Sequence, residues 1–205
     1  AHYIASDMVA LATMTRRYIT MQDGDIVAMT RQQYQILNQQ NRPVTREIHE
    51  LDFQEGATSK GNYRHYMLKE IFEQPEVVSA SLAGHLTQDS LLASLFPQEA
   101  HEMLSTIKRI HIVACGTSYH ASLVGRYWFE ELAGIPCQAE IASEFRYRKH
   151  VVEEGTLLLT FSQSGETADT IAALKHGQQL GYAATVAICN VANSALARMS
   201  DYVLL

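Results

Sequence analysis

Two short stretches of the sequence combine glycine with hydroxyl and amide side chains. The first is Cys115-Gly116-Thr117-Ser118, and the second is Ser162-Gln163-Ser164-Gly165-Glu166-Thr167. Each follows an apolar run and precedes a helical pattern. At a helix start the first backbone N–H groups have no partner within the helix and carry partial positive charge. The two stretches therefore predict a binding site for an anionic group such as phosphate.

The side chains of these loops suit such a ligand. Ser and Thr hydroxyls can donate hydrogen bonds, and Gly116 and Gly165 let the backbone approach a ligand closely. The alternative is that these hydroxyls only cap their helices, but two such loops at neighbouring strand ends favour a binding site. Glu166 is negative, so we assign it to capping or to sugar hydroxyls. Cys115 could be a reactive thiol at a helix start, although a small buried residue at a strand end is the commoner role.

The second half of the chain alternates strands and helices, which would position the loops. We expect strands at residues 110–114, 138–142, 156–161, 184–188 and 202–205, and helices at residues 118–132, 167–180 and 194–199. Gly134 and Pro136 are expected to end the first helix, and Gly181 to cap the second. This pattern predicts an α/β fold with a doubly wound parallel five-stranded sheet flanked by helices. Ligands bind outside the carboxyl ends of such strands, where both loops lie.

The first half has a different pattern. We expect strands at residues 2–6, 16–21, 25–31 and 34–37, with Asp23-Gly24 as a hairpin turn between the second and third. A polar linker is expected at residues 52–61. A helical stretch begins near residue 63, is stopped or redirected by Pro75, and continues as a second helix that Gly84 closes. Two further helices are expected at residues 88–96 and 98–108.

Composition excludes several classes of protein. The chain has 205 residues, 47% hydrophobic and 19% charged, which is typical of one or two globular domains. Its net charge of -6 argues against a nucleic-acid or membrane-surface binder, although Arg146, Arg148, Lys149 and His150 could form a local basic patch. No apolar run has transmembrane length, and the N-terminus lacks a signal-peptide pattern.

The spacing of cysteines, histidines and glycines argues against metals and nucleotide cofactors. Cys115, Cys137 and Cys189 form no CxxC pair, and the nine histidines lack metal-ligand spacing. We infer a reducing, cytoplasmic compartment and no metal. Neither loop matches GxGxxG or GxxxxGK[ST], so a Rossmann dinucleotide site is weakly supported and a P-loop is unsupported. We therefore assign no cofactor.

Several segments are similar to one known family. They are residues 114–119 (ACGTSY), 162–167 (SQSGET), 128–136 (WFEELAGIP), 142–148 (ASEFRYR), 66–71 (YMLKEI), 73–75 (EQP) and 4–7 (IASD). Together they resemble the glucosamine-6-phosphate synthase family, and the resemblance covers essentially the whole chain. The SxSGET loop alone would indicate only the sugar isomerase (SIS) superfamily.

The resemblance implies an aminotransferase that makes glucosamine-6-phosphate from fructose-6-phosphate and glutamine, and a homodimer formed through its isomerase domain. It implies that residues 1–51 end a glutaminase domain, 52–61 form a linker, 62–108 lead into the isomerase domain and 109–205 form its first SIS lobe. The residues that it implies for binding the sugar phosphate are Cys115, Gly116, Thr117, Ser118, Ser162, Gln163, Ser164, Gly165 and Thr167.

The chain also departs from this family. The family's glutaminase nucleophile is an N-terminal cysteine, whereas this chain begins with Ala1 and has no cysteine before Cys115. The lysine, histidine and glutamate of the family's isomerase have no counterpart here. We therefore expect an internal fragment that binds a hexose phosphate weakly and has no catalytic residues of its own.

Two alternatives stay open from the sequence. One is a sugar-phosphate-sensing regulatory module, against which the N-terminal hairpins argue because a sensor more often carries a basic DNA-binding helix-turn-helix there. The other is a flavodoxin-like nucleotide-binding domain, which the motif mismatches disfavour.

Overall fold

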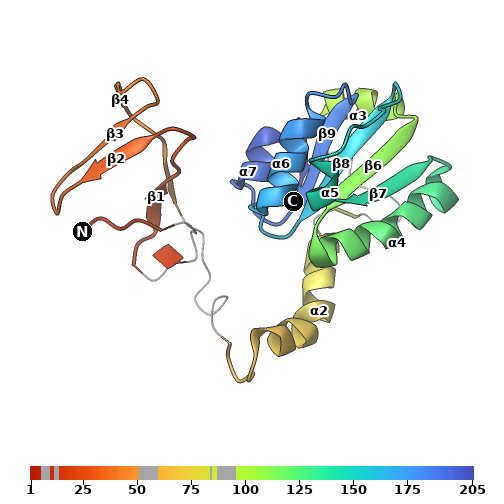
Figure 1. Cartoon of the computed structure of the whole chain (residues 1–205). Coiled ribbons are helices and arrows are strands. Elements are labelled where there is room, and N and C mark those ends of the chain that lie inside the picture. Colours follow the sequence, from red (N-terminus) through yellow and green to blue (C-terminus); the bar gives the residue numbers. More distant parts are fainter. Residues whose placement is uncertain (6–9, 12–13, 51–59, 84, 87–95) are drawn as a thin grey trace. The chain divides into compact units, whose positions relative to one another are not determined.

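The computed structural model describes residues 1–5, 10–11, 14–50, 60–83, 85–86 and 96–205 (Figure 1). The chain divides into two compact units, Ala1–Ala80 and Ser81–Leu205. The second unit contains both predicted loops. In the described part of the chain, no helix combines the length and the apolar character that crossing a bilayer requires.

The second unit is built on a five-stranded parallel sheet. Its strands are β6 (Arg109–Ala114), β7 (Cys137–Ile141), β8 (Thr156–Ser162), β9 (Ala184–Cys189) and β10 (Tyr202–Leu204). They lie in the order β10-β9-β8-β6-β7, and every adjacent pair is parallel. The order reverses direction next to β6, as in a doubly wound fold. The predicted fold class is confirmed, with each strand boundary within one residue or so of its expected place.

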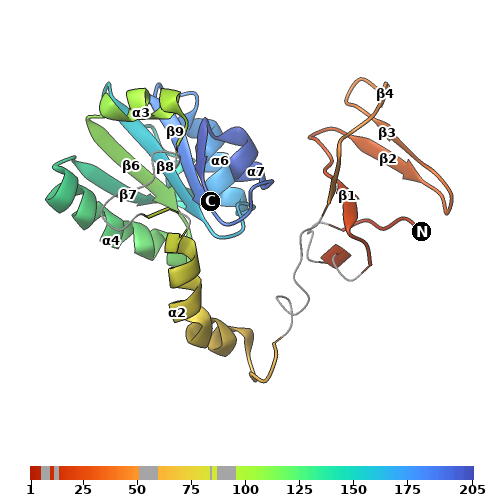
Figure 2. The same cartoon turned by 180° about the vertical axis from the view of Figure 1, so that it is seen from behind.

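Helices cover both faces of this sheet. One face carries α3 (Gln98–Ser105), seen in Figure 2, and α4 (Gly116–Ala133). The other carries α5 (Ala142–Phe145), α6 (Ala168–Gly177) and α7 (Ala195–Met199), seen in Figure 1. Successive strand residues point to opposite faces, so Leu157 and Leu159 join the first core while Leu158 joins the second. Burial on both faces explains why apolar residues follow one another without a polar alternation in much of β8 and β9.

The helix ends differ in part from expectation. Gly134 ends α4 in a left-handed conformation, as predicted. The expectation for Gly181 is wrong, because α6 ends at Gly177 and its cap is Gln178. A side chain at position 177 would meet Leu158, so α6 can approach β8 closely at its last residue. The four-residue helix α5 was not expected.

The first unit is antiparallel. It contains β1 (Arg17–Ile19), β2 (Ile26–Met29), β3 (Tyr34–Leu37), β4 (Pro43–Val44) and β5 (Ile48–Glu50). β2, β3 and β4 form one sheet, while β1 pairs with β5. The predicted hairpin between β1 and β2 is therefore wrong, although Gly24 does occupy a turn with a φ of 85°. Residues 2–5 form no strand.

A long helix, α2 (Tyr66–Ala83), crosses the division between the units. Of the two outcomes expected at Pro75, a stop or a redirection, the stop is wrong, because the helix continues on both sides of this residue. A proline inside a helix removes one backbone hydrogen bond but does not always end the helix. The expected helix at residues 88–96, Gly84 and most of the linker at residues 52–61 lie outside the described residues.

A polar cluster is buried beside the sheet. His111 is 7% exposed, and its Nδ1 atom lies 2.7 Å from the Tyr182 hydroxyl. Its Nε2 atom lies 3.2 Å from a Glu140 carboxylate oxygen, outside hydrogen-bond geometry. Burial lowers the pKa of His111 to about 4, against the attraction of Glu140. Although burial opposes it, the hydrogen bond from Arg148 holds the pKa of Glu140 below its ordinary value.

The close packing at Gly177 gives a matched pair of substitutions. Gly177→Ala places a methyl group 2.3 Å from a Leu158 methyl, and we expect a loss of about 1–3 kcal/mol in the free energy of unfolding. In Gly125→Ala the nearest atom is 3.9 Å away, and we expect a gain of about 0.5–1 kcal/mol. Urea unfolding measures both. Equal shifts in the same direction would contradict the packing described.

The buried histidine predicts a pH dependence of stability. Between pH 6.5 and about 4 the unfolded chain binds a proton at His111 that the folded chain excludes. Stability should therefore fall as pH falls through this range, by up to about 3 kcal/mol from this residue. His111→Gln should remove this part of the loss in urea unfolding at pH 7 and 4.5, whereas His120→Gln, on the exposed side of α4, should leave it. An NMR titration midpoint near 6.5 for His111 would refute the assignment.

Candidate anion-binding site

The two predicted loops lie at the same edge of the sheet. β6 and β8 are neighbours, and Ala114, the last residue of β6, pairs with Phe161 of β8. The first loop follows Ala114 and the second includes Ser162 at the end of β8. The structure thus brings the predicted site residues together at adjacent carboxyl ends, where parallel α/β sheets bind ligands.

The first loop is the start of an 18-residue helix. Cys115 precedes α4 in an extended conformation, and its side chain makes no capping hydrogen bond. The thiol packs against the core on the α5–α6 face, in keeping with the structural role considered for it. Gly116 has a φ of 56°, and a side chain there would face open space. The first-turn amides of Gly116, Thr117 and Ser118 have no acceptor within the helix, so they can receive an anion.

The second loop is arranged differently. The Gly165 amide donates to the Ser162 hydroxyl oxygen at 3.0 Å, and the Glu166 amide donates to the Ser164 hydroxyl oxygen at 3.2 Å. The expectation of free backbone N–H groups is therefore wrong for Gly165 and Glu166.

This arrangement changes which groups the loop can offer. A hydroxyl oxygen that accepts from an amide keeps its own proton to donate. Thr167 Oγ1 lies 3.3 Å from Ser162 Oγ, so these two hydroxyls are also in contact. Ser164 and Thr167 are half-buried, Gln163 is exposed and Ser162 is 6% exposed. The loop thus presents mainly hydroxyl donors to a ligand, where backbone amides were predicted.

A third segment, which sequence reasoning missed, contacts the second loop. Residues 190–194 between β9 and α7, named here the β9–α7 turn, begin with Asn190, whose amide donates to the Gln163 carbonyl at 3.2 Å. The Ala195 amide donates to the Glu166 carboxylate at 2.7 Å. Of the two roles considered for Glu166, capping is the one seen, on α7 rather than on its own helix. The sequence signal available was Ser194, which caps α7.

The basic residues do not gather at the loops. Arg148, Lys149 and His150 line a hollow of about 320 Å³ with Gln138 and Thr156, at the amino ends of the strands. Arg146 instead pairs with Asp169 in the first turn of α6, at 2.7 Å.

In the described residues, no group of three or more His, Cys, Asp or Glu side chains could hold a metal ion.

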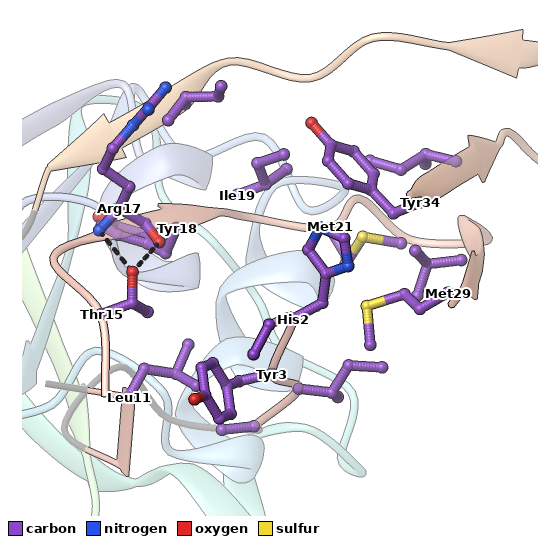
Figure 3. A pocket seen from close by; sticks show the side chains of 16 residues that line it. His2, Tyr3, Leu11, Thr15, Arg17, Tyr18, Ile19, Met21, Met29 and Tyr34 are labelled. Carbon is purple, nitrogen blue, oxygen red and sulfur yellow. Dashed lines mark hydrogen bonds between the residues drawn. The ribbon is translucent and has the colours of Figure 1, made fainter. Parts of the chain in front are cut away.

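A larger hollow, of about 580 Å³, lies in the first unit (Figure 3). Figure 3 shows His2, Met21, Met29 and Tyr34 side chains around it, and Thr15 hydrogen-bonded to the backbone of Arg17. Its other lining residues are mostly aliphatic. Neither hollow is lined by a residue of the two loops. The hollow in the first unit is lined mainly by apolar and aromatic side chains, with His2, Thr15 and Arg17 as the other polar residues.

Comparison with known proteins identifies the family to which this part of the chain is similar. Residues 103–205 match the SIS domain family. Glutamine–fructose-6-phosphate aminotransferase (isomerizing) of Haemophilus ducreyi is 51% identical over 201 residues, which are 98% of this chain and 33% of that protein. The protein of that name in Pseudomonas syringae pv. tomato is 51% identical over 206 residues, 100% of this chain and 33% of that protein.

A solved structure is similar to this chain as well. The C-terminal domain of glucosamine-fructose-6-phosphate aminotransferase from Francisella tularensis superimposes with a TM-score of 0.68 and 48% identity, covering 72% of this chain and 41% of that one. These relatives confirm the resemblance seen in the sequence, and the chain spans about a third of the length of the curated ones. Because the matching residues 103–205 make up half of the chain and include the whole parallel sheet and both loops, this chain belongs to the SIS domain family.

Proposed function

We propose that this chain is part of an enzyme that makes glucosamine-6-phosphate from fructose-6-phosphate and glutamine, and that it carries the lobe that binds the sugar phosphate. The observation that carries the proposal is the adjacency of two hydroxyl-bearing loops at the carboxyl ends of β6 and β8. The identity of about one half along nearly the whole chain favours this enzyme over a sugar-phosphate sensor.

The geometry supports a division of roles within the site. The first-turn amides of α4 suit the phosphate, because they have no acceptor within the helix and lie at the positive end of the helix dipole. The hydroxyls of Ser162, Ser164 and Thr167 would donate to further phosphate oxygens. Gln163 is exposed, and its amide can both donate and accept, which suits sugar hydroxyls.

We further propose that the full-length protein is a cytoplasmic homodimer assembled through its isomerase domain. Three large side chains of α4 support a buried interface, since Tyr127, Trp128 and Leu132 are 60%, 61% and 80% exposed. The three unpaired cysteines support a reducing compartment.

Ligand binding tests the site. Fructose-6-phosphate or glucosamine-6-phosphate should raise the melting temperature of the 205-residue chain, whereas NAD and FMN should not. Ser164→Ala and Thr167→Ala should each weaken the affinity about 10- to 150-fold, because each removes one hydrogen bond to a charged group.

The control for this test is Ser105→Ala. Ser105 ends α3, and its hydroxyl donates to the Glu102 carbonyl, away from the loops. Its substitution should leave affinity unchanged. The site assignment fails if all three variants bind as the unchanged chain does, or if NAD stabilises the chain as much as the sugar phosphates do.

Activity gives a separate prediction. We expect the 205-residue chain alone neither to release ammonia from glutamine nor to convert fructose-6-phosphate, because it spans about a third of its relatives' length. A coupled glutamate assay and detection of glucosamine-6-phosphate would measure this. Turnover above the buffer blank by the purified chain would show that it contains the reacting groups.

A further inference from the structure

We propose that Glu166 is a positioning residue which, together with the β9–α7 turn, holds the second loop in its ligand-binding conformation before any ligand arrives. This inference rests on the proposed function of the second loop. Glu166 lies between site residues in the sequence, yet its carboxylate is directed to the start of α7. Its role would therefore be exerted through the loop backbone and not by contact with the sugar phosphate.

Three hydrogen bonds join the second loop to the segment that begins with the β9–α7 turn. The Gln163 carbonyl accepts from the Asn190 amide at 3.2 Å, and the Gly165 carbonyl accepts from the Leu196 amide at 3.0 Å. The third is the bond of 2.7 Å from the Ala195 amide to the Glu166 carboxylate. These contacts fix the loop at three of its six residues. Two of them use backbone carbonyls, so Glu166 supplies the one side-chain contact among them.

The contact at Gly165 is too close for any other residue. A Cβ atom there would lie 2.1 Å from Ser194 Oγ, and the φ of Gly165 is +66°. Ser194 cannot easily move away, because it is 1% exposed and its hydroxyl accepts from the Ala197 amide as the cap of α7. The loop is thus packed against a buried, hydrogen-bonded residue as well as bonded to it. Such packing makes the two segments move together.

The direction of Glu166 also has an electrostatic consequence. A free carboxylate in this loop would repel a phosphate held by the neighbouring residues. Bonded to the Ala195 amide, the carboxylate is turned toward a backbone donor and its charge is partly compensated. The same contact therefore orders the loop and directs a negative charge to α7. Ordering a loop in advance improves affinity, because less conformational entropy is lost on binding.

Two substitutions separate these effects. Glu166→Gln removes the charge but keeps an oxygen that can accept from Ala195, whereas Glu166→Ala removes both. Glu131→Ala, on the exposed side of α4, controls for the change in net charge. Fructose-6-phosphate affinity is measured by calorimetry. Hydrogen–deuterium exchange of the Gly165, Glu166 and Ala195 amides is measured without ligand.

We expect Glu166→Ala to bind fructose-6-phosphate about tenfold more weakly and to exchange these three amides faster. Glu166→Gln should bind as tightly as the unchanged chain or more tightly, and its exchange should be close to that of the unchanged chain. Glu131→Ala should match the unchanged chain in both. Equal weakening in Glu166→Gln and Glu166→Ala, with the exchange of the three amides unchanged in both, would overturn the proposal, since the carboxylate would then act on the ligand and not through the loop.

The proposal would also be overturned if these amides exchanged at the same rate in Glu166→Ala as in the unchanged chain, because the carboxylate would then not hold the loop. If the unchanged chain binds no sugar phosphate, the proposed function fails and the exchange measurement still decides the positioning role. Faster exchange of the loop amides in Glu166→Ala alone would then support it.

Discussion

The parallel pairing of β6 with β8 is the constraint on which the site depends. It places Ala114 beside Phe161, and hence the end of one strand beside the end of the other. A shift of register would separate the loops along the strand direction by about 3.3 Å per residue. The register is fixed by burial on both faces, because each strand must send alternate side chains into two different cores. The site is therefore positioned by the hydrophobic core.

The sheet and its helices could be predicted because their signal is local and strong. Leu157, Leu158 and Leu159 form an unbroken apolar run, which is typical of a strand buried on both sides. The pairing of the strands in the first unit could not be predicted in the same way, because β1 pairs with β5, where Tyr18 faces His49, and not with the neighbouring β2. Local turn signals such as Asp23-Gly24 predict a turn but do not determine which strands pair. Pro75 is a second example, because proline disfavours the interior of a helix and yet lies inside α2.

The residue types of the candidate site could be predicted from the sequence, and its geometry only in part. The hydroxyls and glycines of both loops were identified, and their placement at one edge follows from the topology. The hydrogen bonds from the Gly165 and Glu166 amides to the serine hydroxyls could not be predicted, since they depend on how the side chains of Ser162 and Ser164 are oriented. The bond between Glu166 and Ala195 joins residues 29 positions apart, and no local pattern in the sequence indicates it.

The electrostatics of the loops favour an anion site made from neutral donors. Arg146, the basic residue in contact with the first turn of α6, is paired with Asp169. The remaining members of the predicted basic patch line a hollow at the amino ends of the strands. In the proposed site, positive potential would come from the α4 amides and the hydroxyl protons, whose strength depends on orientation more than on charge. A site of this kind is sensitive to the position of each donor, which is why contacts that fix the loop backbone matter as much as the residues that would touch the ligand.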